Sequence, residues 1–237
     1  MKIYAIADLH LSFDERIDKS MDVFGPGWGD HAERVKAAWT ELVTDDDIVI
    51  IAGDISWGLK LDEAMADLDW IHELPGQKVL LRGNHDLWWC RIQHLRTLYD
   101  DMHFLQNDCY YVEALDLAIC GSRGWPTPDA TTYTEHDEKM YLREQGRLRN
   151  SLVEAKKKGA SRIIMAMHYP PAKVEETEFT RIMQEYGVTQ CVYGHLHGMV
   201  AWTNGIKGEH GGIDYKLVSL DYLGAKPKLI HDSEQEM

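Results

Sequence analysis

Seven side chains of the kinds that bind divalent metals follow short apolar runs along the chain. They comprise two carboxylates, one amide and four imidazoles, namely Asp8, His10, Asp54, Asn84, His168, His195 and His197. Each alone has an ordinary explanation, because Asp and Asn commonly end strands and an isolated His is more often structural than a ligand. Seven donors exceed what a single cation needs when solvent and substrate also bind, so two ions are the simpler interpretation.

The donor types restrict both the metal and the chemistry. A mixture of nitrogen and oxygen ligands favours Mn, Fe, Zn or Co over Ca or Mg, which prefer oxygen. Two such ions, about 3.5 to 4 Å apart, need a bridging carboxylate; they polarise a shared water into a hydroxide nucleophile and clamp the phosphoryl oxygens during in-line displacement. The seven residues therefore predict hydrolysis of a phosphoester.

The elements that must position these residues are strands and helices in alternation. Helical spacing and capping signals predict helices after a capping box at Asp30 and Glu33, over residues 61–74, and from Glu138 to Lys158. Two further strands are expected after residue 197, in "MVAW" and "DYKLVSL". Short apolar runs with β-branched residues and Gly or polar boundaries predict six strands, at residues 2–7, 48–52, 78–81, 117–120, 162–167 and 190–193.

This alternation indicates an α/β fold, whose functional loops gather outside the carboxyl ends of the strands. On a strand, residues two apart point to the same face, so Asp8 with His10, and His195 with His197, could each offer two side chains to one spot. The 237 residues are predicted to form one domain. Two long loops, at residues 13–30 and 122–137, are either lids or ordinary surface loops.

The motifs stand in a characteristic order: "DLH" at 8–10, "GD" at 53–54, "GNHD" at 83–86, then His168, and "GHLH" at 194–197. Each is weak alone, but the five in order resemble the calcineurin-like metallophosphoesterase superfamily over most of the chain. The resemblance implies a four-layer αββα sandwich, in which two mixed sheets pack face to face with helices outside.

The resemblance also implies a role for each motif residue. His85 is similar to the family's histidine that binds no metal and instead protonates the leaving oxygen or steadies the transition state. The family pattern places one metal on Asp8, His10 and His197, the other on Asn84, His168 and His195, and uses Asp54 as the bridge.

Residues beside these motifs carry two interpretations each. Asp86 would orient the His85 imidazole, or cap a helix beginning near Leu87, and the two roles are compatible. Arg82 would contact phosphate or pair with an acid. Protein phosphatases of the superfamily carry an Asp and an Arg after the second motif, whereas this chain reads "GDISWG", which disfavours a phosphoprotein substrate. Arg123 could replace the missing arginine or could be a surface residue.

The composition bears on the substrate class. A net charge of −14 repels phosphate backbones and anionic membranes, although two bound cations would reverse the field locally. The expected substrate is therefore a small organic phosphomonoester or phosphodiester. A metal-dependent nuclease is the alternative, which the absence of a basic stripe disfavours. A non-catalytic interaction module on the same fold is a further alternative, which the presence of every motif residue disfavours.

Cysteine usage and apolar runs bear on the compartment. The four cysteines form no CxxC pair, the N-terminus lacks a signal-peptide pattern, and no apolar run is long enough to span a bilayer. We therefore expect a cytoplasmic protein with reduced thiols and no membrane partner. The oligomeric state stays open, although aromatic loops would suit a homodimer.

Several aromatic residues flank the polar clusters and would either stack on a flat organic group or fill the core, among them Trp28, Trp57, Trp88, Trp89, Trp125 and Tyr169.

Overall fold

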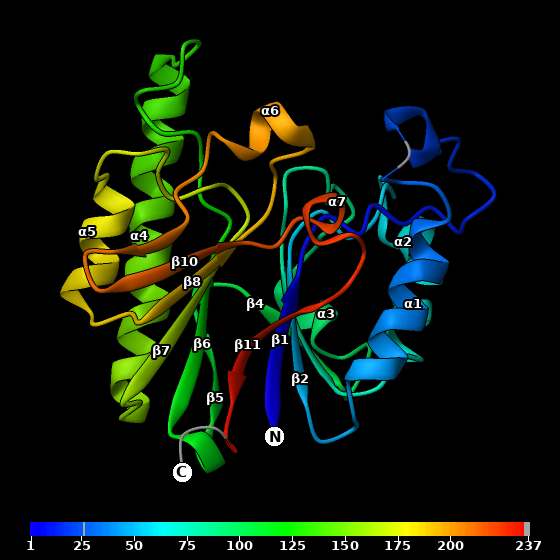
Figure 1. The fold of residues 1–237 in the computed structure, drawn as a ribbon, viewed down its shortest axis with the longest axis horizontal. Helices are drawn as coiled ribbons and strands as arrows, with labels where there is room; N and C mark the ends of the chain where they lie inside the picture. The colour runs from blue at the N-terminus through cyan, green and yellow to red at the C-terminus, as the bar shows by residue number, and fades with distance from the viewer. Residues whose placement is uncertain (26, 235–237) are drawn as a thin grey trace.

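Two mixed β-sheets pack face to face, and helices cover the outer face of each (Figure 1). The computed structural model describes residues 1–25 and 27–234. The first sheet has the order β11-β1-β2-β3-β4, with β1 at Lys2–Ile6, β2 at Ile48–Ala52, β3 at Gln77–Leu81, β4 at Met102–Leu105 and β11 at Lys228–Asp232. The second has the order β5-β6-β7-β8-β10-β9, with β5 at Cys109–Val112, β6 at Leu117–Ser122, β7 at Arg162–Met167, β8 at Gln190–Tyr193, β9 at Gly208–His210 and β10 at Ile213–Leu217.

The central strands of each sheet are parallel, so their carboxyl ends share one edge. In the first sheet β1, β2, β3 and β4 are parallel, and β11 pairs antiparallel with β1. In the second, β6, β7, β8 and β10 are parallel, with antiparallel β5 and β9 at the edges. The six predicted strands correspond to β1, β2, β3, β6, β7 and β8, and the α/β sandwich confirms the predicted fold.

The helices lie where the chain crosses between parallel strands. In Figure 1, α1 (His31–Leu42) and α2 (Leu61–His72) cover the first sheet at the right, while α4 (Glu135–Lys158) and α5 (Glu178–Glu185) cover the second at the left. Short helical segments occupy the connections: η1 at Met21–Phe24, α3 at Ile92–Leu95, η2 at Glu113–Leu115, α6 at Gly198–Trp202 and α7 at Leu220–Leu223.

Three apolar clusters separate the four layers. The middle cluster lies between the sheets and includes Ile50 and Val79 from the first sheet with Ile119 and Ile164 from the second. The outer clusters join each sheet to its helices; Trp39 of α1, for example, is fully buried against the first sheet. Strands buried on both faces explain the continuous apolar runs of the sequence, which show no polar alternation.

The long helix α4 begins and ends at strong local signals. Thr134 accepts a hydrogen bond from the Asp137 N–H, and the Asp137 carboxylate accepts one from the Thr134 N–H, which forms a capping box. Its last turn is Lys156–Lys158, and Gly159 follows at φ +81°, a conformation that glycine adopts readily. The three lysines thus lie where positive charge favours the negative end of the helix dipole.

Three expectations about secondary structure were wrong. "MVAW" forms part of α6; Met199 and Val200 are about four-fifths exposed, and only Trp202 of this run packs against a core cluster. At the start of α1, Asp30 makes no side-chain cap and has φ +48°. The helix expected near Leu87 begins only at Ile92, because Leu87 and Trp88 form a turn.

The two long loops lie beside the strand carboxyl ends. The segment 13–30 includes η1, and its residue 26 lies outside the described residues. The segment 122–137 runs from the end of β6 to the first turn of α4. Within the part of the chain that the structure describes, no helix combines the length and the apolar character needed to cross a bilayer.

Candidate metal centre

All seven predicted side chains follow strands that end at the same edge of the two sheets. Asp8 and His10 follow β1, Asp54 follows β2 and Asn84 follows β3, all in the first sheet. The second sheet contributes His168 after β7, and His195 with His197 after β8. The centre therefore lies across the top of both sheets, and neither sheet holds it alone.

Four of these residues have a left-handed backbone. The φ angles are +61° at Asp8, +46° at His10, +52° at Asp54 and +73° at His195. Such values are uncommon outside glycine and cluster at functional sites, where the surrounding structure holds the strain. The strands end before these residues, so the strand alternation used in the sequence argument does not bring them together; the left-handed turns do.

Backbone hydrogen bonds fix the turns to one another. The Asp8 N–H donates to Gly53 O at 2.9 Å, and the His10 N–H donates to Asp54 O at 3.0 Å. The His195 N–H donates to both oxygens of Asp8, at 3.1 and 3.0 Å. The loops after β1 and β2 are thus tied together through backbone groups, and the loop after β8 is tied to them through the Asp8 carboxylate.

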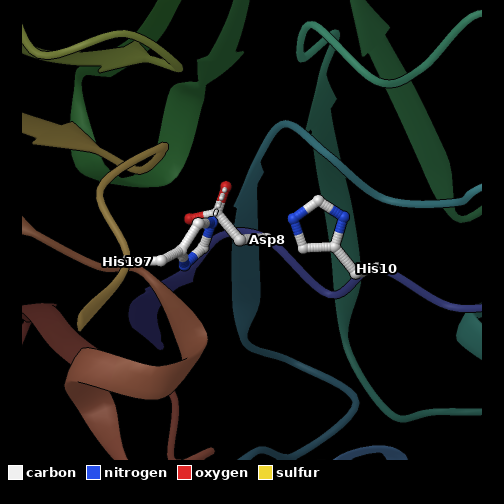
Figure 2. Close-up of side chains that lie close together, drawn as sticks. All are labelled: Asp8, His10 and His197. Carbon is white, nitrogen blue, oxygen red and sulfur yellow. Dashed lines mark ion pairs between the residues drawn. The ribbon is translucent and has the colours of Figure 1, made fainter. Parts of the chain in front are cut away.

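The first group of donors comprises Asp8, His10 and His197, whose ligand atoms all lie within 4.8 Å of one another. Figure 2 shows these three side chains, which come from the loops after β1 and β8. The distance from His197 Nε2 to Asp8 Oδ1 is 3.8 Å. The other ring nitrogen, His197 Nδ1, lies 3.0 Å from an oxygen of Asp221, and such a carboxylate partner fixes the ring orientation of a metal-binding histidine.

The second group comprises Asp54, His168 and His195, again within 4.8 Å. His168 Nδ1 lies 3.1 Å from Ala52 O, which turns Nε2 toward the centre. That Nε2 lies 2.8 Å from Asn84 Oδ1, so the predicted amide ligand adjoins this group.

Asp54 stands between the two groups. Its Oδ2 lies 3.4 Å from His168 Nε2 and 3.8 Å from His10 Nε2, so one carboxylate faces a histidine of each group. Its Oδ1 accepts a hydrogen bond of 2.8 Å from the His85 N–H. This is the placement that a bridging carboxylate requires.

The electrostatics of the centre favour a bound cation. Burial lowers the pKa of His10 and of His195 to about 3, so both imidazoles are neutral at pH 7, which is the form that binds metals. Burial raises the pKa of the Asp8 carboxyl to about 6, while the nearby histidines oppose that shift. A divalent cation beside Asp8 would favour its charged form.

His168 and Asp54 shift each other in opposite directions. Burial disfavours the charged form of His168, but the Asp54 carboxylate outweighs it and raises the histidine pKa to about 9. Burial likewise opposes ionisation of Asp54, yet the charge of His168 and its hydrogen bond hold that pKa below the ordinary range. A metal ion that binds here must displace the proton of His168, so metal binding is expected to release a proton.

The two ring nitrogens of His10 have different surroundings. His10 Nδ1 is buried, and among the described residues it has no hydrogen-bond partner. A buried polar atom left unpaired is costly, and most such atoms in proteins have a partner, water or an ion. The nitrogen of His10 that faces the centre is Nε2, so the fit to divalent metal ions rests on the two buried carboxylates and the neutral imidazoles.

A cavity of about 350 Å³ opens beside the centre. His10, Asp54, His195 and His197 line it on one side, and His85 lines it as well. The remaining wall is largely apolar and consists of Met21, Phe24, Trp28, Trp57, Gly198 and Asp221. The His85 ring packs against Trp57 with centroids 4.5 Å apart, and burial lowers the pKa of His85 below its ordinary value.

The structure gives Asp86 a different contact set from the one expected. The carboxylate is fully buried and accepts hydrogen bonds from the backbone N–H groups of residues 54, 55, 56 and 83 and from the Trp88 indole. No hydrogen bond joins it to His85 within residues 1–25 and 27–234, and no helix begins beside it for it to cap. Asp86 therefore holds the loop after β2 to the loop after β3.

Arg82 and Arg123 lie apart from the first cavity. Both line a second, smaller cavity of about 140 Å³, whose lining shares no residue with the first. Arg82 Nε donates to Asp86 O at 3.2 Å, and the Arg123 guanidinium carbon lies 4.6 Å from the ring centre of Trp125. A contact of either arginine with substrate phosphate stays a prediction.

Sequence reasoning missed one polar residue of the site. Asp221 orients His197 and accepts a hydrogen bond of 2.9 Å from the Gly198 N–H. It lies in the first turn of α7, directly after the apolar run 214–220 that was expected to be a strand, so the rule of a polar group after such a run also points to it. Of the aromatic residues considered, Trp28 and Trp57 line the cavity, whereas Trp88 and Trp89 are buried in the core.

Comparisons with known proteins agree with this geometry. The family model of the calcineurin-like phosphoesterases matches residues 1–199. The Gene 66 protein of Mycobacterium phage D29 is 36% identical over 84 residues, which are 35% of this chain and 40% of that protein. The chain thus aligns with less than half the length of this relative.

Two solved structures share the fold at low sequence identity. A protein of unknown function from Aquifex aeolicus, AQ665, superposes with a TM-score of 0.52 at 16% identity. The superposition covers 99% of this chain and 96% of the AQ665 chain. The protein TT1561 of Thermus thermophilus gives a TM-score of 0.55 at 12% identity, covering 97% of each chain. At these identities the likeness establishes the fold alone.

Proposed function

The chain belongs to the calcineurin-like phosphoesterase family, and from this premise we propose that it hydrolyses a phosphoester bond of a small organic molecule with two divalent metal ions. One observation carries the proposal: the Asp54 carboxylate stands between two separate groups of metal-binding side chains, 3.8 Å from His10 and 3.4 Å from His168. A single mononuclear site would leave one of these buried groups without a cation.

The proposed ligand sets follow the two groups. One metal would be held by the first set, Asp8, His10 and His197, and the other by the second set, Asn84, His168 and His195, with Asp54 shared between them. When bound, divalent metals of this kind polarise phosphoryl oxygens and lower the pKa of water, which supplies both the electrophile and the nucleophile of phosphoester hydrolysis. Mn, Fe, Zn and Co all suit these nitrogen and oxygen donors.

His85 is the proposed residue that acts on the leaving group. It lines the cavity beside the two donor groups, and its ring lies 5.7 Å from that of His10. Its backbone N–H is bound to Asp54, so the residue is held in place while the imidazole stays available to a substrate oxygen. From this position the imidazole would hydrogen-bond or protonate the departing oxygen.

The cavity wall supports an organic group with a flat or apolar face. Trp28 and Trp57 stand beside the donor groups, with Met21 and Phe24 completing the apolar side. Aromatic walls of this kind stack on planar groups and exclude water from the reacting atoms. A small phosphomonoester or phosphodiester of an apolar alcohol is therefore the proposed substrate class.

We further propose that residues 1–237 act as one domain in which segments 13–30 and 122–137 border the substrate. Met21, Phe24 and Trp28 of the first segment line the main cavity. Thr131 of the second lines a cavity shared with Tyr169 and His195. We expect a non-hydrolysable phosphonate to protect both segments from limited proteolysis; unchanged cleavage at both would refute the assignment as lids.

The central test replaces the shared carboxylate by its neutral isostere. We expect Asp54→Asn to lower metal content below two ions per chain and to abolish hydrolysis of p-nitrophenyl phosphate and of bis-p-nitrophenyl phosphate. Elemental analysis and absorbance assays measure these effects, and the preferred ester separates a monoesterase from a diesterase. Undiminished turnover by Asp54→Asn would refute the proposal.

A matched control is available at Asp116. This residue also has a left-handed backbone, at φ +48°, but it precedes β6 at the opposite end of the sheet. Asp116→Asn should retain both metals and full activity, so a loss confined to Asp54→Asn reports on the centre rather than on a strained aspartate.

A second variant separates the chemical step from metal binding. His85→Asn should lower kcat by about 10²- to 10⁴-fold, the usual range for a general acid or base, while both ions remain bound. His94→Asn, at an exposed position on α3, serves as the control. Loss of a metal from His85→Asn would contradict the role given to this residue.

A further inference from the structure

Four arginines from three parts of the chain converge on the second cavity. Arg82 follows β3 and Arg123 follows β6, while Arg143 and Arg147 lie one turn apart on α4. The cavity lies at the carboxyl ends of the strands. Arg82 is two residues before Asn84 in the sequence, but the cavity shares no lining residue with the one beside the candidate metal centre.

The cavity lining carries less negative charge than positive charge. Among the described residues that line the cavity, Glu144 is the sole carboxylate, and its side chain is fully buried. One of its oxygens pairs with Arg147 at 2.8 Å and with Arg143 at 3.5 Å; the other accepts from the Ser122 hydroxyl at 3.1 Å. The cavity lining therefore carries a surplus of positive charge.

The two remaining guanidinium groups are only partly satisfied. Arg82 donates through Nε to a backbone oxygen, Asp86 O. Arg123 stacks on Trp125, and its Nε is buried without a hydrogen-bond partner in the part of the chain that the structure describes. A buried N–H of a charged group that lacks an acceptor is costly, so its presence indicates an acceptor that comes from outside the chain.

The surplus is unusual for this protein. The chain has 25 basic and 39 acidic residues, yet the described lining of this cavity holds four arginines and one acid. Like charges held together repel one another and destabilise a fold unless an anion compensates them. Arginine also presents a planar fork of donors that matches the oxygens of phosphate in bidentate geometry.

We propose that this arginine pocket, lined by Arg82, Arg123, Arg143 and Arg147, is a binding site for a phosphoryl group, distinct from the candidate metal centre. The pocket has about the volume of four to five liquid waters, which suits inorganic phosphate or the phosphate of a larger molecule whose organic part stays outside. The proposal does not depend on the hydrolytic function proposed above.

The test is calorimetric titration of inorganic phosphate into the full chain, with added Mn²⁺ and again with EDTA. Chelation removes phosphate binding at any metal centre and leaves the arginine pocket intact. In EDTA we expect one phosphate per chain, with affinity at least tenfold weaker for Arg147→Gln because a charge-assisted contact is lost. Binding that vanishes entirely with EDTA, or is equal for wild type and Arg147→Gln, would overturn the proposal.

Two further variants keep the test independent of folding defects. Glu144→Gln keeps the shape of the buried side chain but removes its charge, so phosphate should bind several-fold more tightly, an effect that a damaged fold does not produce. Arg149→Gln removes a neighbouring arginine of α4 that pairs with Glu178 and Glu185 and lies outside the pocket, so its phosphate affinity should equal that of wild type. Weaker binding by Glu144→Gln would count against the pocket.

Titration of phenylphosphonate distinguishes the two sources of the phosphoryl group. Binding as tight as that of phosphate indicates that the pocket accepts the phosphate of an organic molecule. Binding of phosphate alone indicates a site for the free ion. Either result supports the pocket, provided that Arg147→Gln weakens it, whereas equal binding by the variant contradicts it.

Discussion

Gly53, between β2 and Asp54, has no room for a side chain. Its φ is +89°, and a Cβ atom built on it would lie 2.7 Å from His168 Nδ1 and 2.9 Å from the backbone nitrogen of Gly83. Both distances fall short of ordinary contact, and the Gly83 contact is with backbone that cannot rotate away. Gly53→Ala therefore forces either His168 or the loop after β3 out of position.

The size of the effect follows from two contributions. Overpacking a tight site costs about 1–3 kcal/mol, and the left-handed backbone costs about 1–2 kcal/mol more for alanine. We therefore expect Gly53→Ala to lower the free energy of unfolding by about 2–5 kcal/mol. Displacement of His168 also moves a proposed metal ligand, and a shift of about 1 Å near reacting atoms lowers activity about 100-fold.

Two other glycines separate these contributions. Gly159 has a similar φ, +81°, and nothing described lies within 4 Å of the position that a Cβ atom would take there, so Gly159→Ala isolates the backbone cost. Gly146 lies inside α4 with equally open space, and Gly146→Ala should stabilise the protein by about 0.5–1 kcal/mol. Urea unfolding, metal analysis and aryl phosphate hydrolysis measure all three variants. If Gly53→Ala behaves like Gly159→Ala and keeps its metals and turnover, the steric reasoning is refuted.

Three further outcomes are expected. Asp221→Asn should weaken metal binding about 10- to 100-fold, because His197 loses the carboxylate that orients it; metal titration with unchanged affinity would remove Asp221 from the site. Burial raises the pKa of Asp67 to about 6 against 3.8 in the unfolded chain, so its contribution to stability is present below pH 4 and lost as pH rises through 6. Asp67→Asn should consequently gain about 3 kcal/mol over wild type at pH 8 and nothing at pH 4, and thermal unfolding with a difference independent of pH would contradict the burial argument. Removal of metal with EDTA should lower the Tm, since an ion at 100 times its Kd adds about 2.7 kcal/mol to the folded state; an identical Tm with and without EDTA would show that no tight site exists.

The strands were predictable where burial on both faces left continuous β-branched runs. β2 and β7 are such runs, and each is followed at once by the polar residues of the site. The strands that the sequence did not predict are β4, β5, β9 and β11, and all four lie at sheet edges. Of these, β5, β9 and β11 are partly exposed, so no apolar run marks them. The apolar run that contains Met199 and Val200 led to the opposite error: a strand was expected there, but the run lies in the helix α6 and these two side chains are exposed.

The sequence predicted which side chains come together, but not how the backbone brings them together. Residue types and motif order named the seven side chains that the structure places at one edge, and their role as metal ligands stays a prediction. The left-handed turns at Asp8 and Asp54 leave no mark in composition, because Asp is also common in ordinary loops. Asp86 joins two loops by accepting hydrogen bonds from backbone N–H groups 30 to 32 residues away in the chain. No local sequence pattern predicts contacts over that separation. The arginine pocket likewise forms only when α4 packs on β6 and the two sheets pack together, which brings Arg143 and Arg147 near Arg82 and Arg123.

The proposed ligands come from loops of both sheets. Each half of the chain therefore carries only part of either ligand set. A break between Gln106 and Asn107, in the turn that joins β4 to β5, would leave Asp8, His10, Asp54 and Asn84 on one fragment and the three remaining histidines on the other. Neither fragment alone would contain all the proposed ligands of a metal, so metal binding would stabilise the complex of the two fragments. We expect the fragments to associate more tightly with Mn²⁺ than with EDTA, which makes occupancy of the centre a reporter of whether the two halves are joined.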